Sequence, residues 1–178
     1  MRITPQNKIV SFTNLIIIAN LIMFGVQNSI SNGTLYFGLN PYFFEFGLYH
    51  QLLSTMFVHG GFFHIFMNMF VLYQFGNIIE SHLGGFKYLS LYFIGGLLTS
   101  IGSLIYMYLT GDWANLVGAS GAISVLLGWF ALKDSYQRQG IIVWILLISF
   151  APLLLGMPVA WYSHLIGFGL GWLMGYFI

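Results

Sequence analysis

Residues 116–128 read LVGASGAISVLLG, a stretch in which small residues open an apolar run. The run continues only to residue 132, and about 14 helical residues rise only ~21 Å. The hydrocarbon core of a bilayer is about 30 Å thick, so this helix is too short to cross it fully. We therefore predict a helix over 119–132 whose start, with Ser120, lies in a hollow below the membrane surface.

The small residues at the start of this helix have two interpretations. A buried serine can bond a carbonyl one turn earlier, and glycine lets two helices touch, so Ser120 and Gly121 could serve packing alone. A serine hydroxyl also becomes a nucleophile when a nearby base takes its proton. The choice depends on which side chains the rest of the chain brings to Ser120.

The composition predicts an all-α integral membrane protein. Of 178 residues, 58% are hydrophobic and 5% are charged, whereas a soluble domain carries about 25% charged residues. The chain has no cysteine, which excludes disulfides and thiolate metal sites. The net charge of +1 gives no indication of a nucleic-acid partner. The expected surroundings are a lipid bilayer.

Apolar runs near the ~20-residue length of a membrane span predict a bundle of six transmembrane helices. We expect a single domain over 1–178 without a separate soluble part. The six spans are 9–27, 62–82, 86–109, 119–132, 140–155 and 162–178.

The basic residues predict the orientation of this bundle. With six spans, all five fall on one side of the membrane, and basic loops favour the cytoplasmic side. The five are Arg2, Lys8, Lys87, Lys133 and Arg138. Both termini are then cytoplasmic. Small size and the lack of cysteine fit a bacterial inner membrane, with an organellar membrane as the alternative.

Residues 29–61, between the first two spans, are rich in aromatic side chains and include Pro41. Aromatic rings favour the membrane interface. We predict a membrane-embedded first outer loop of short segments, with a re-entrant hairpin as the alternative.

Polar side chains gather where the even-numbered spans begin, on the outer side. His59, His64 and Asn68 surround the start of the second span, Ser120 opens the fourth, and His164 opens the sixth. Polar groups inside a membrane are costly and mark functional sites. His64 and Asn68 are four residues apart and share a helix face.

Glycines in the sixth span predict which helix it packs against. Gly167, Gly171 and Gly175 form a stripe that permits close backbone contact. If the partner is the fourth span, with Gly121 and Gly128, the packing brings His164 against Ser120.

A serine beside a histidine indicates nucleophilic catalysis, with Ser120 attacking and His164 as general base. His64, Asn68 and the backbone N–H of Ser120 could donate to the resulting oxyanion. The acidic residues are all distant from His164 in sequence, so we expect a Ser–His dyad with the imidazole oriented by packing. These acids are Glu45, Glu80, Asp112 and Asp134.

The motifs GASGA, HGGFFHIFMNMF and SHLIGFGLG, in this order, resemble those of rhomboid intramembrane serine proteases. The resemblance covers the whole chain as a minimal six-span core. It implies Ser120 as nucleophile, His164 as base, and His64 and Asn68 as oxyanion-hole residues. It also implies substrates that are transmembrane helices of other proteins, without cofactor or metal. Supporting positions are His59, Gly118, Gly121 and Glu80, the last in a cytoplasmic turn.

Two positions depart from the family pattern. The family often has Trp-Arg where this chain has His50 and Gln51, which puts the anchoring of the first outer loop in question. The family also tends to have an aromatic residue four positions after the serine, where this chain has Ser124. We expect another ring, that of Trp161 or Tyr162, to hold His164.

The sequence thus predicts an intramembrane serine endopeptidase that cuts transmembrane helices near the outer leaflet. The alternatives are a non-catalytic rhomboid-like binder of membrane proteins and a small transporter. A transporter would place polar groups near the midplane, whereas here they gather at one end of the bundle. A membrane zinc protease would need an HExxH motif, which the chain lacks.

Overall fold

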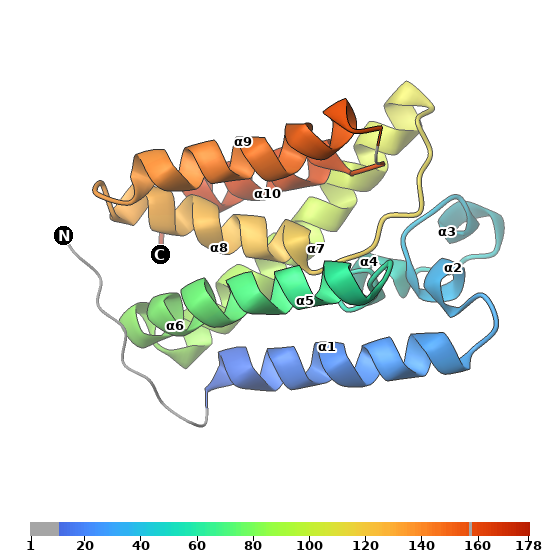
Figure 1. Ribbon diagram of the computed structural model, residues 1–178, viewed down its shortest axis with the longest axis horizontal. Helices are drawn as coiled ribbons and strands as arrows, with labels where there is room; N and C mark the ends of the chain where they lie inside the picture. The colour runs from blue at the N-terminus through green and yellow to red at the C-terminus, as the bar shows by residue number, and fades with distance from the viewer. Residues whose placement is uncertain (1–10, 157) are drawn as a thin grey trace.

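The computed structural model describes residues 11–156 and 158–178, and these form an all-α bundle (Figure 1). Long helical segments occupy all six predicted positions. They are α1 (Phe12–Ser29), α5 (Phe62–Val71) continued by the π-helical turn η1 (Leu72–Gly76) and α6 (Asn77–Leu83), α7 (Gly85–Thr110), α8 (Ser120–Lys133), α9 (Arg138–Leu154) and α10 (Trp161–Met174). The last helix stops short of the predicted boundary at 178.

Within the described residues, three segments are long and apolar enough to cross a membrane: Phe12–Ser29, Phe62–Leu83 and Gly85–Thr110. Helices α8, α9 and α10 have 14, 17 and 14 residues. The count of six crossings therefore stays a prediction. Exposed apolar side chains along α1, such as Leu15, Ile18 and Ile22, suit contact with lipid.

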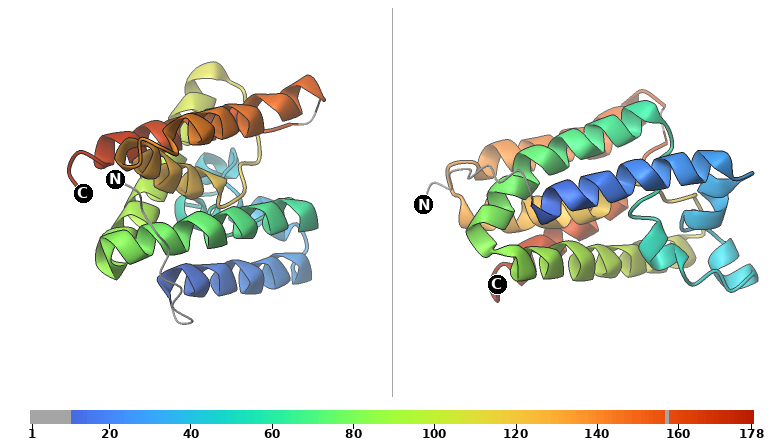
Figure 2. Two further views of the ribbon diagram at one scale, coloured as in Figure 1. Left: turned by 60° about the vertical axis from the view of Figure 1, so that its left-hand side comes forward. Right: turned by 90° about the horizontal axis from the view of Figure 1, so that it is seen from below.

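Helix α8 lies at the centre of the bundle. Every side chain from Ala122 to Ala131 is buried, and α8 contacts α5, η1, α7, α9 and α10. Figure 1 shows it between the α9–α10 pair and the α5–α6 segment, with α1 beyond, and Figure 2 shows the same bundle from two further sides. The helix that begins at Ser120 is thus the one most enclosed by its neighbours.

The glycine stripe of α10 packs on α8, as the sequence predicts. A Cβ on Gly171 would meet the backbone carbonyl of Val125, and one on Gly128 would meet that of Phe168. A Cβ on Gly167 would likewise meet the carbonyl of Gly121. Since these contacts advance together along both helices, α8 and α10 run parallel and begin at the same end of the bundle.

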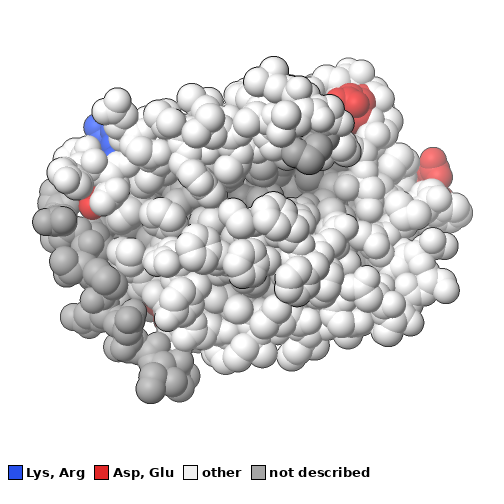
Figure 3. Space-filling model, in the orientation of Figure 1, with Lys and Arg blue, Asp and Glu red and all other residues white. Residues whose placement is uncertain are grey.

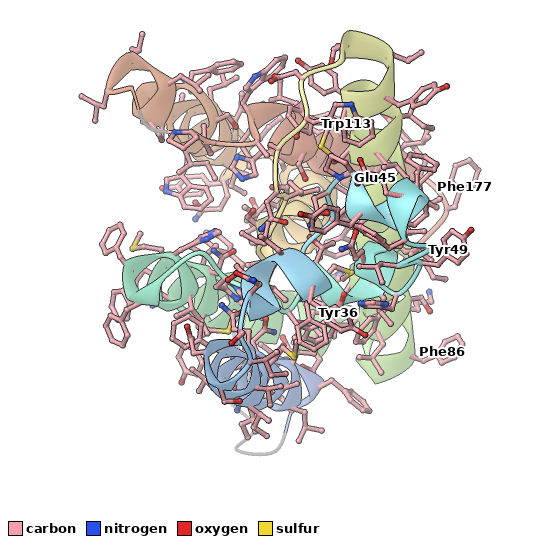
Figure 4. All side chains as sticks on the ribbon, turned by 90° about the vertical axis from the view of Figure 1, so that its right-hand side faces the viewer. Tyr36, Glu45, Tyr49, Phe86, Trp113 and Phe177 are labelled. Atoms are coloured by element: carbon pink, nitrogen blue, oxygen red, sulfur yellow. The ribbon has the colours of Figure 1, made fainter. Side chains whose placement is uncertain are left out.

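Three short helices form the first outer loop: α2 (Gly33–Phe37), α3 (Tyr42–Glu45) and α4 (Gln51–Ser54). This agrees with the prediction of short segments. Figure 4 looks onto this end of the molecule, where the labelled Tyr36, Tyr49 and Trp113 lie at the surface. Whether the loop lies in the membrane interface stays a prediction.

Gln51 anchors this loop where the family often has arginine. The side chain is fully buried, and its Nε2 donates to the carbonyls of Leu35 at 3.1 Å and Tyr36 at 3.2 Å. Its Oε1 accepts from the backbone N–H of Asn40 at 3.4 Å. A neutral amide therefore ties α4 to the chain around α2.

The loop is also tied to the segment that leads into α8. Leu39 and Leu116 exchange two backbone hydrogen bonds, of 2.9 and 2.8 Å. The Thr55 hydroxyl donates to the Leu116 carbonyl at 2.6 Å, and the Gly118 N–H donates to the Thr55 carbonyl at 2.9 Å. The first outer loop thus fixes the approach to Ser120.

The opposite end of the bundle carries the described basic residues. Lys87 lies in the first turn of α7, Lys133 ends α8 and Arg138 begins α9, and these helix ends lie together at the left of Figure 1. The face seen in Figure 3 shows charge only toward its two ends. Arg2 and Lys8 lie outside the described residues.

Glu80 has a structural place at this basic end. Its two carboxylate oxygens accept from the backbone N–H groups of Phe12 and Thr13 and from the Thr13 hydroxyl, each at 2.8 Å. The first N–H groups of a helix lack intrahelical partners and attract negative charge. Glu80 therefore caps α1.

Candidate active site

Ser120 and His164 come together at the shared starting end of α8 and α10. The Oγ of Ser120 lies 3.1 Å from Nε2 of His164. His164 is buried, whereas Ser120 is half-buried. Because Ser120 is the first residue of α8, its backbone N–H is among those a helix leaves without an intrahelical acceptor. A serine hydroxyl, an imidazole and a backbone donor thus share one place.

His64 lies against the backbone just before Ser120. Gly118 has a φ of +122°, and a Cβ there would lie 2.8 Å from both Cε1 and Nε2 of His64. Only glycine suits this conformation and this contact. The Gly60 N–H donates to Nδ1 of His64 at 3.3 Å, so the neutral ring carries its hydrogen on Nε2. That hydrogen is on the side of the ring that faces Gly118.

Asn68 lies one turn further along α5 and is buried. Its Nδ2 donates to the backbone carbonyl of His64 at 2.8 Å. An amide has two N–H hydrogens, so one remains for another acceptor. In the described part of the chain Asn68 and Ser120 do not bond each other.

His59 supports the residue that precedes Ser120. It is fully buried, and its backbone N–H and C=O bond the side-chain amide of Gln27 at 2.9 and 2.6 Å. Nδ1 lies 3.2 Å from the Phe57 carbonyl and must donate to it, so Nε2 accepts from the Ala119 N–H at 3.4 Å. Burial lowers the pKa of His59 to about 4, with His64 nearby adding to the effect and the Phe57 carbonyl opposing it.

The prediction that an aromatic ring holds His164 is wrong for the described residues. Tyr162 instead stacks on Tyr106, with ring centroids 4.1 Å apart, and Trp161 packs edge-on against the same ring. Both rings therefore pack against Tyr106 of α7. His164 is buried elsewhere at the start of α10.

The partner of His164 that the sequence did not indicate is Ser149 on α9. Its Oγ lies 3.2 Å from Nδ1 of His164. The available signal was a serine within the apolar run ILLISF, residues 145–150 of α9, since polar residues inside membrane spans are functional suspects.

Of the remaining predicted positions, Gly121 lies near Ser120 and Glu80 does not. Gly121 lies in the interface of three helices, where a Cβ would come 3.0 Å from Cγ2 of Thr99 and 3.1 Å from Oγ of Ser163. Glu80 lies far from Ser120, at the other end of the bundle (Figure 1). Among residues 11–156 and 158–178, no three His, Asp or Glu side chains gather as metal ligands would.

Comparison with known proteins places this arrangement in a family. The rhomboid domain matches residues 47–178. RHOMBOID-like protein 4 of Arabidopsis thaliana is 35% identical over 135 residues, covering 71% of this chain and 33% of that protein. RHOMBOID-like protein 7 of the same plant is 31% identical over 136 residues, covering 72% of this chain and 42% of that protein.

A third relative is the presenilin-associated rhomboid-like protein A, mitochondrial, of Danio rerio. It is 32% identical over 92 residues, covering 52% of this chain and 24% of that protein. The matched regions make up less than half the length of each of these relatives. The rhomboid-domain match over 47–178 includes the helices that carry Ser120 and His164, and the chain is an integral membrane protein of the rhomboid family.

Proposed function

We propose that the protein is an intramembrane serine endopeptidase that cleaves transmembrane helices of other membrane proteins. The observation that carries the proposal is the 3.1 Å contact between Oγ of Ser120 and Nε2 of His164. This is the contact a base needs to take a hydroxyl proton as the oxygen attacks a carbonyl carbon.

In the first step Oγ of Ser120 attacks the scissile carbonyl and its proton passes to Nε2 of His164. The carbonyl oxygen becomes an oxyanion, for which the Ser120 backbone N–H, Nε2–H of His64 and the free amide hydrogen of Asn68 are candidate donors. His164 then gives its proton to the leaving amine. Water then attacks the acyl-enzyme and gives a proton to His164, which returns that proton to Oγ of Ser120 as the ester bond breaks and the acid product leaves.

The substrate must unwind locally before Ser120 can attack. A carbonyl inside a transmembrane helix is already hydrogen-bonded and is shielded by the turns around it. We therefore expect helix-weakening residues such as glycine, alanine, serine or proline near the cut.

The proposed setting is a bacterial inner membrane, with both termini cytoplasmic and residues 1–178 acting as one domain. Support comes from Lys87, Lys133 and Arg138 at the end of the bundle away from Ser120. The start of α8 then faces outward, and cleavage occurs near the outer leaflet. Two of the relatives come from a plant and one carries a mitochondrial name, so an organellar membrane is the alternative setting.

The test combines a serine-directed fluorophosphonate probe with cleavage of a reporter transmembrane substrate in liposomes. We expect the wild type to label and to cleave, and Ser120→Ala and His164→Ala to do neither. Folded wild-type protein that neither labels nor cleaves would favour the non-catalytic binder or the transporter.

A further inference from the structure

The geometry points to Ser149 as a positioning residue that holds His164 in the tautomer required of a general base. This inference rests on the proposed protease function for its kinetic consequence. The hydrogen-bond arrangement behind it can be measured without any turnover.

Ser149 has its hydroxyl hydrogen already engaged. The side chain is fully buried on α9, and Oγ lies 2.7 Å from the carbonyl of Ile145, one turn earlier. A hydroxyl has one hydrogen and a carbonyl can only accept, so the hydrogen is donated to Ile145. The lone pairs of Oγ are left for the other neighbour, Nδ1 of His164 at 3.2 Å.

This arrangement decides which nitrogen of His164 carries the hydrogen. Because Ser149 accepts, Nδ1 must donate, and the neutral imidazole then has an unprotonated Nε2. That nitrogen is the one 3.1 Å from the Ser120 hydroxyl. In the opposite tautomer the lone pair on Nδ1 would face the lone pairs on Oγ, unless Ser149 gave up its hydrogen bond to the Ile145 carbonyl.

The same bond helps while the reaction proceeds. When Nε2 accepts the Ser120 proton, the ring becomes positively charged, and Nδ1–H remains bonded to an oxygen that carries partial negative charge. In serine proteases with a triad, a carboxylate in this place sets the tautomer and stabilises the imidazolium. Ser149, on α9, offers a neutral version of that contact.

Packing alone does not explain the placement of Ser149. Serine and threonine often bond the carbonyl one turn earlier in membrane helices, and Thr99 and Ser100 on α7 do so at 2.8 and 3.2 Å. Both are buried, like Ser149, yet within residues 11–156 and 158–178 neither bonds a second side chain. The bond to His164 distinguishes Ser149 from these ordinary cases.

The kinetic test uses the full chain in liposomes, with Ser100→Ala as the matched control because it removes a similar buried hydroxyl. We expect Ser149→Ala to lower kcat about tenfold with KM changed by less than about twofold. Ser149→Thr, which keeps an oxygen, should recover most of kcat, and Ser100→Ala should leave kcat unchanged. Wild-type kcat in Ser149→Ala, or an equal loss in Ser100→Ala, would overturn the inference.

A second measurement reads the tautomer directly. Solid-state ¹⁵N NMR of histidine-labelled protein in liposomes, with the His164 signals assigned by their loss in His164→Gln, should show a protonated Nδ1 and an unprotonated Nε2. In Ser149→Ala the two tautomers should mix. A wild type protonated on Nε2, or no change in Ser149→Ala, would refute the role of Ser149. Wild-type protein without Ser120-dependent cleavage would refute the protease proposal, and the NMR result would still decide the Ser149 bond.

Discussion

Gly118 is the residue on which the approach of His64 to Ser120 depends. Its φ of +122° is one that residues with a side chain rarely adopt. The position that a Cβ would occupy also faces the His64 ring. The ring can lie beside Ser120 only while this position has no Cβ. Both the conformation and the contact therefore require glycine.

We expect Gly118→Ala to reduce cleavage by at least about tenfold and to destabilise the fold by about 1–3 kcal/mol. The control is Gly111→Ala, which also has a positive φ, of +72°, but has nothing within 4 Å of the added Cβ. It should lose some stability and keep its activity per folded molecule. Equal activity losses in the two variants would mean that the contact between position 118 and His64 does not cause the loss. Turnover and thermal unfolding in detergent measure both quantities.

The role of Asn68 can be separated from folding, because among the residues that the structure describes its side chain bonds only a carbonyl of its own helix. Asn68→Ala should lower kcat about 10- to 100-fold, since lost oxyanion donors cost about 10²–10³ in other enzymes. The unfolding temperature should change little. A parallel loss of folding and activity would count against an oxyanion role for Asn68.

His59 makes the stability of the outer loop depend on pH. Its two ring nitrogens donate to Phe57 and accept from Ala119, so the folded protein needs the neutral ring. The folded pKa is about 4, below the usual 6.5. Between these values an unfolded chain binds a proton at His59 that the folded chain does not, so the contribution is complete above pH 6.5 and is lost as pH falls toward 4.

The unfolding temperature of the wild type should therefore fall between pH 7.5 and pH 5. In His59→Gln, which cannot titrate in this range, the fall should be smaller. His82→Gln changes an exposed histidine at the other end of the bundle and should keep the full fall. An identical pH response in wild type and His59→Gln would mean that His59 does not govern it.

At the scale of helices, the interface of α8 and α10 follows from local patterns in the sequence. The stripe of Gly167, Gly171 and Gly175 predicts close contact with a second glycine-bearing helix, and the structure has that contact. The meeting of Ser120 and His164 follows from this parallel pairing. Ser149 could not be predicted, because its contact depends on how α9 is rotated about its axis, and no periodic pattern records that rotation.

The loop anchors show the same division. The departure from the family pattern at His50 and Gln51 left the anchoring of the first outer loop in question, because which carbonyls Gln51 bonds depends on how α2 and α4 fold together. The orientation of Trp161 and Tyr162 depends likewise on Tyr106, which is more than 50 residues earlier in the chain. Contacts between helices of unknown rotation are the part that one sequence does not specify.

Gly171→Ala tests the pairing of α8 and α10. The new Cβ would meet the backbone carbonyl of Val125, which cannot move as a side chain could, so the helices must separate. We expect cleavage to fall at least about 100-fold, because misplacement by about 1 Å costs about 10² in rate. Gly169→Ala, on the exposed side of α10 with nothing within 4 Å, should be active. Full activity in Gly171→Ala would mean that the register of the two helices does not set the Ser120–His164 contact.

The whole molecule has two chemically different ends. The described basic residues lie at one end, and the first outer loop, Ser120 and the acidic residues Glu45 and Asp112 lie toward the other. Basic residues favour the cytoplasmic side, so the two ends support the proposed orientation of the bundle and, with it, the proposed cleavage near the outer leaflet.

The orientation can be tested with single cysteines, because the chain has none of its own. Asp112→Cys lies just after α7 and Lys133→Cys ends α8, and both positions are exposed. In intact cells a membrane-impermeant maleimide should label position 112 and should reach position 133 only after the membrane is opened. The reverse pattern would turn the catalytic end toward the cytoplasm. Labelling of both positions in intact cells would mean that α8 does not cross the membrane, and the six-span bundle would have to be abandoned together with a cut near the outer leaflet.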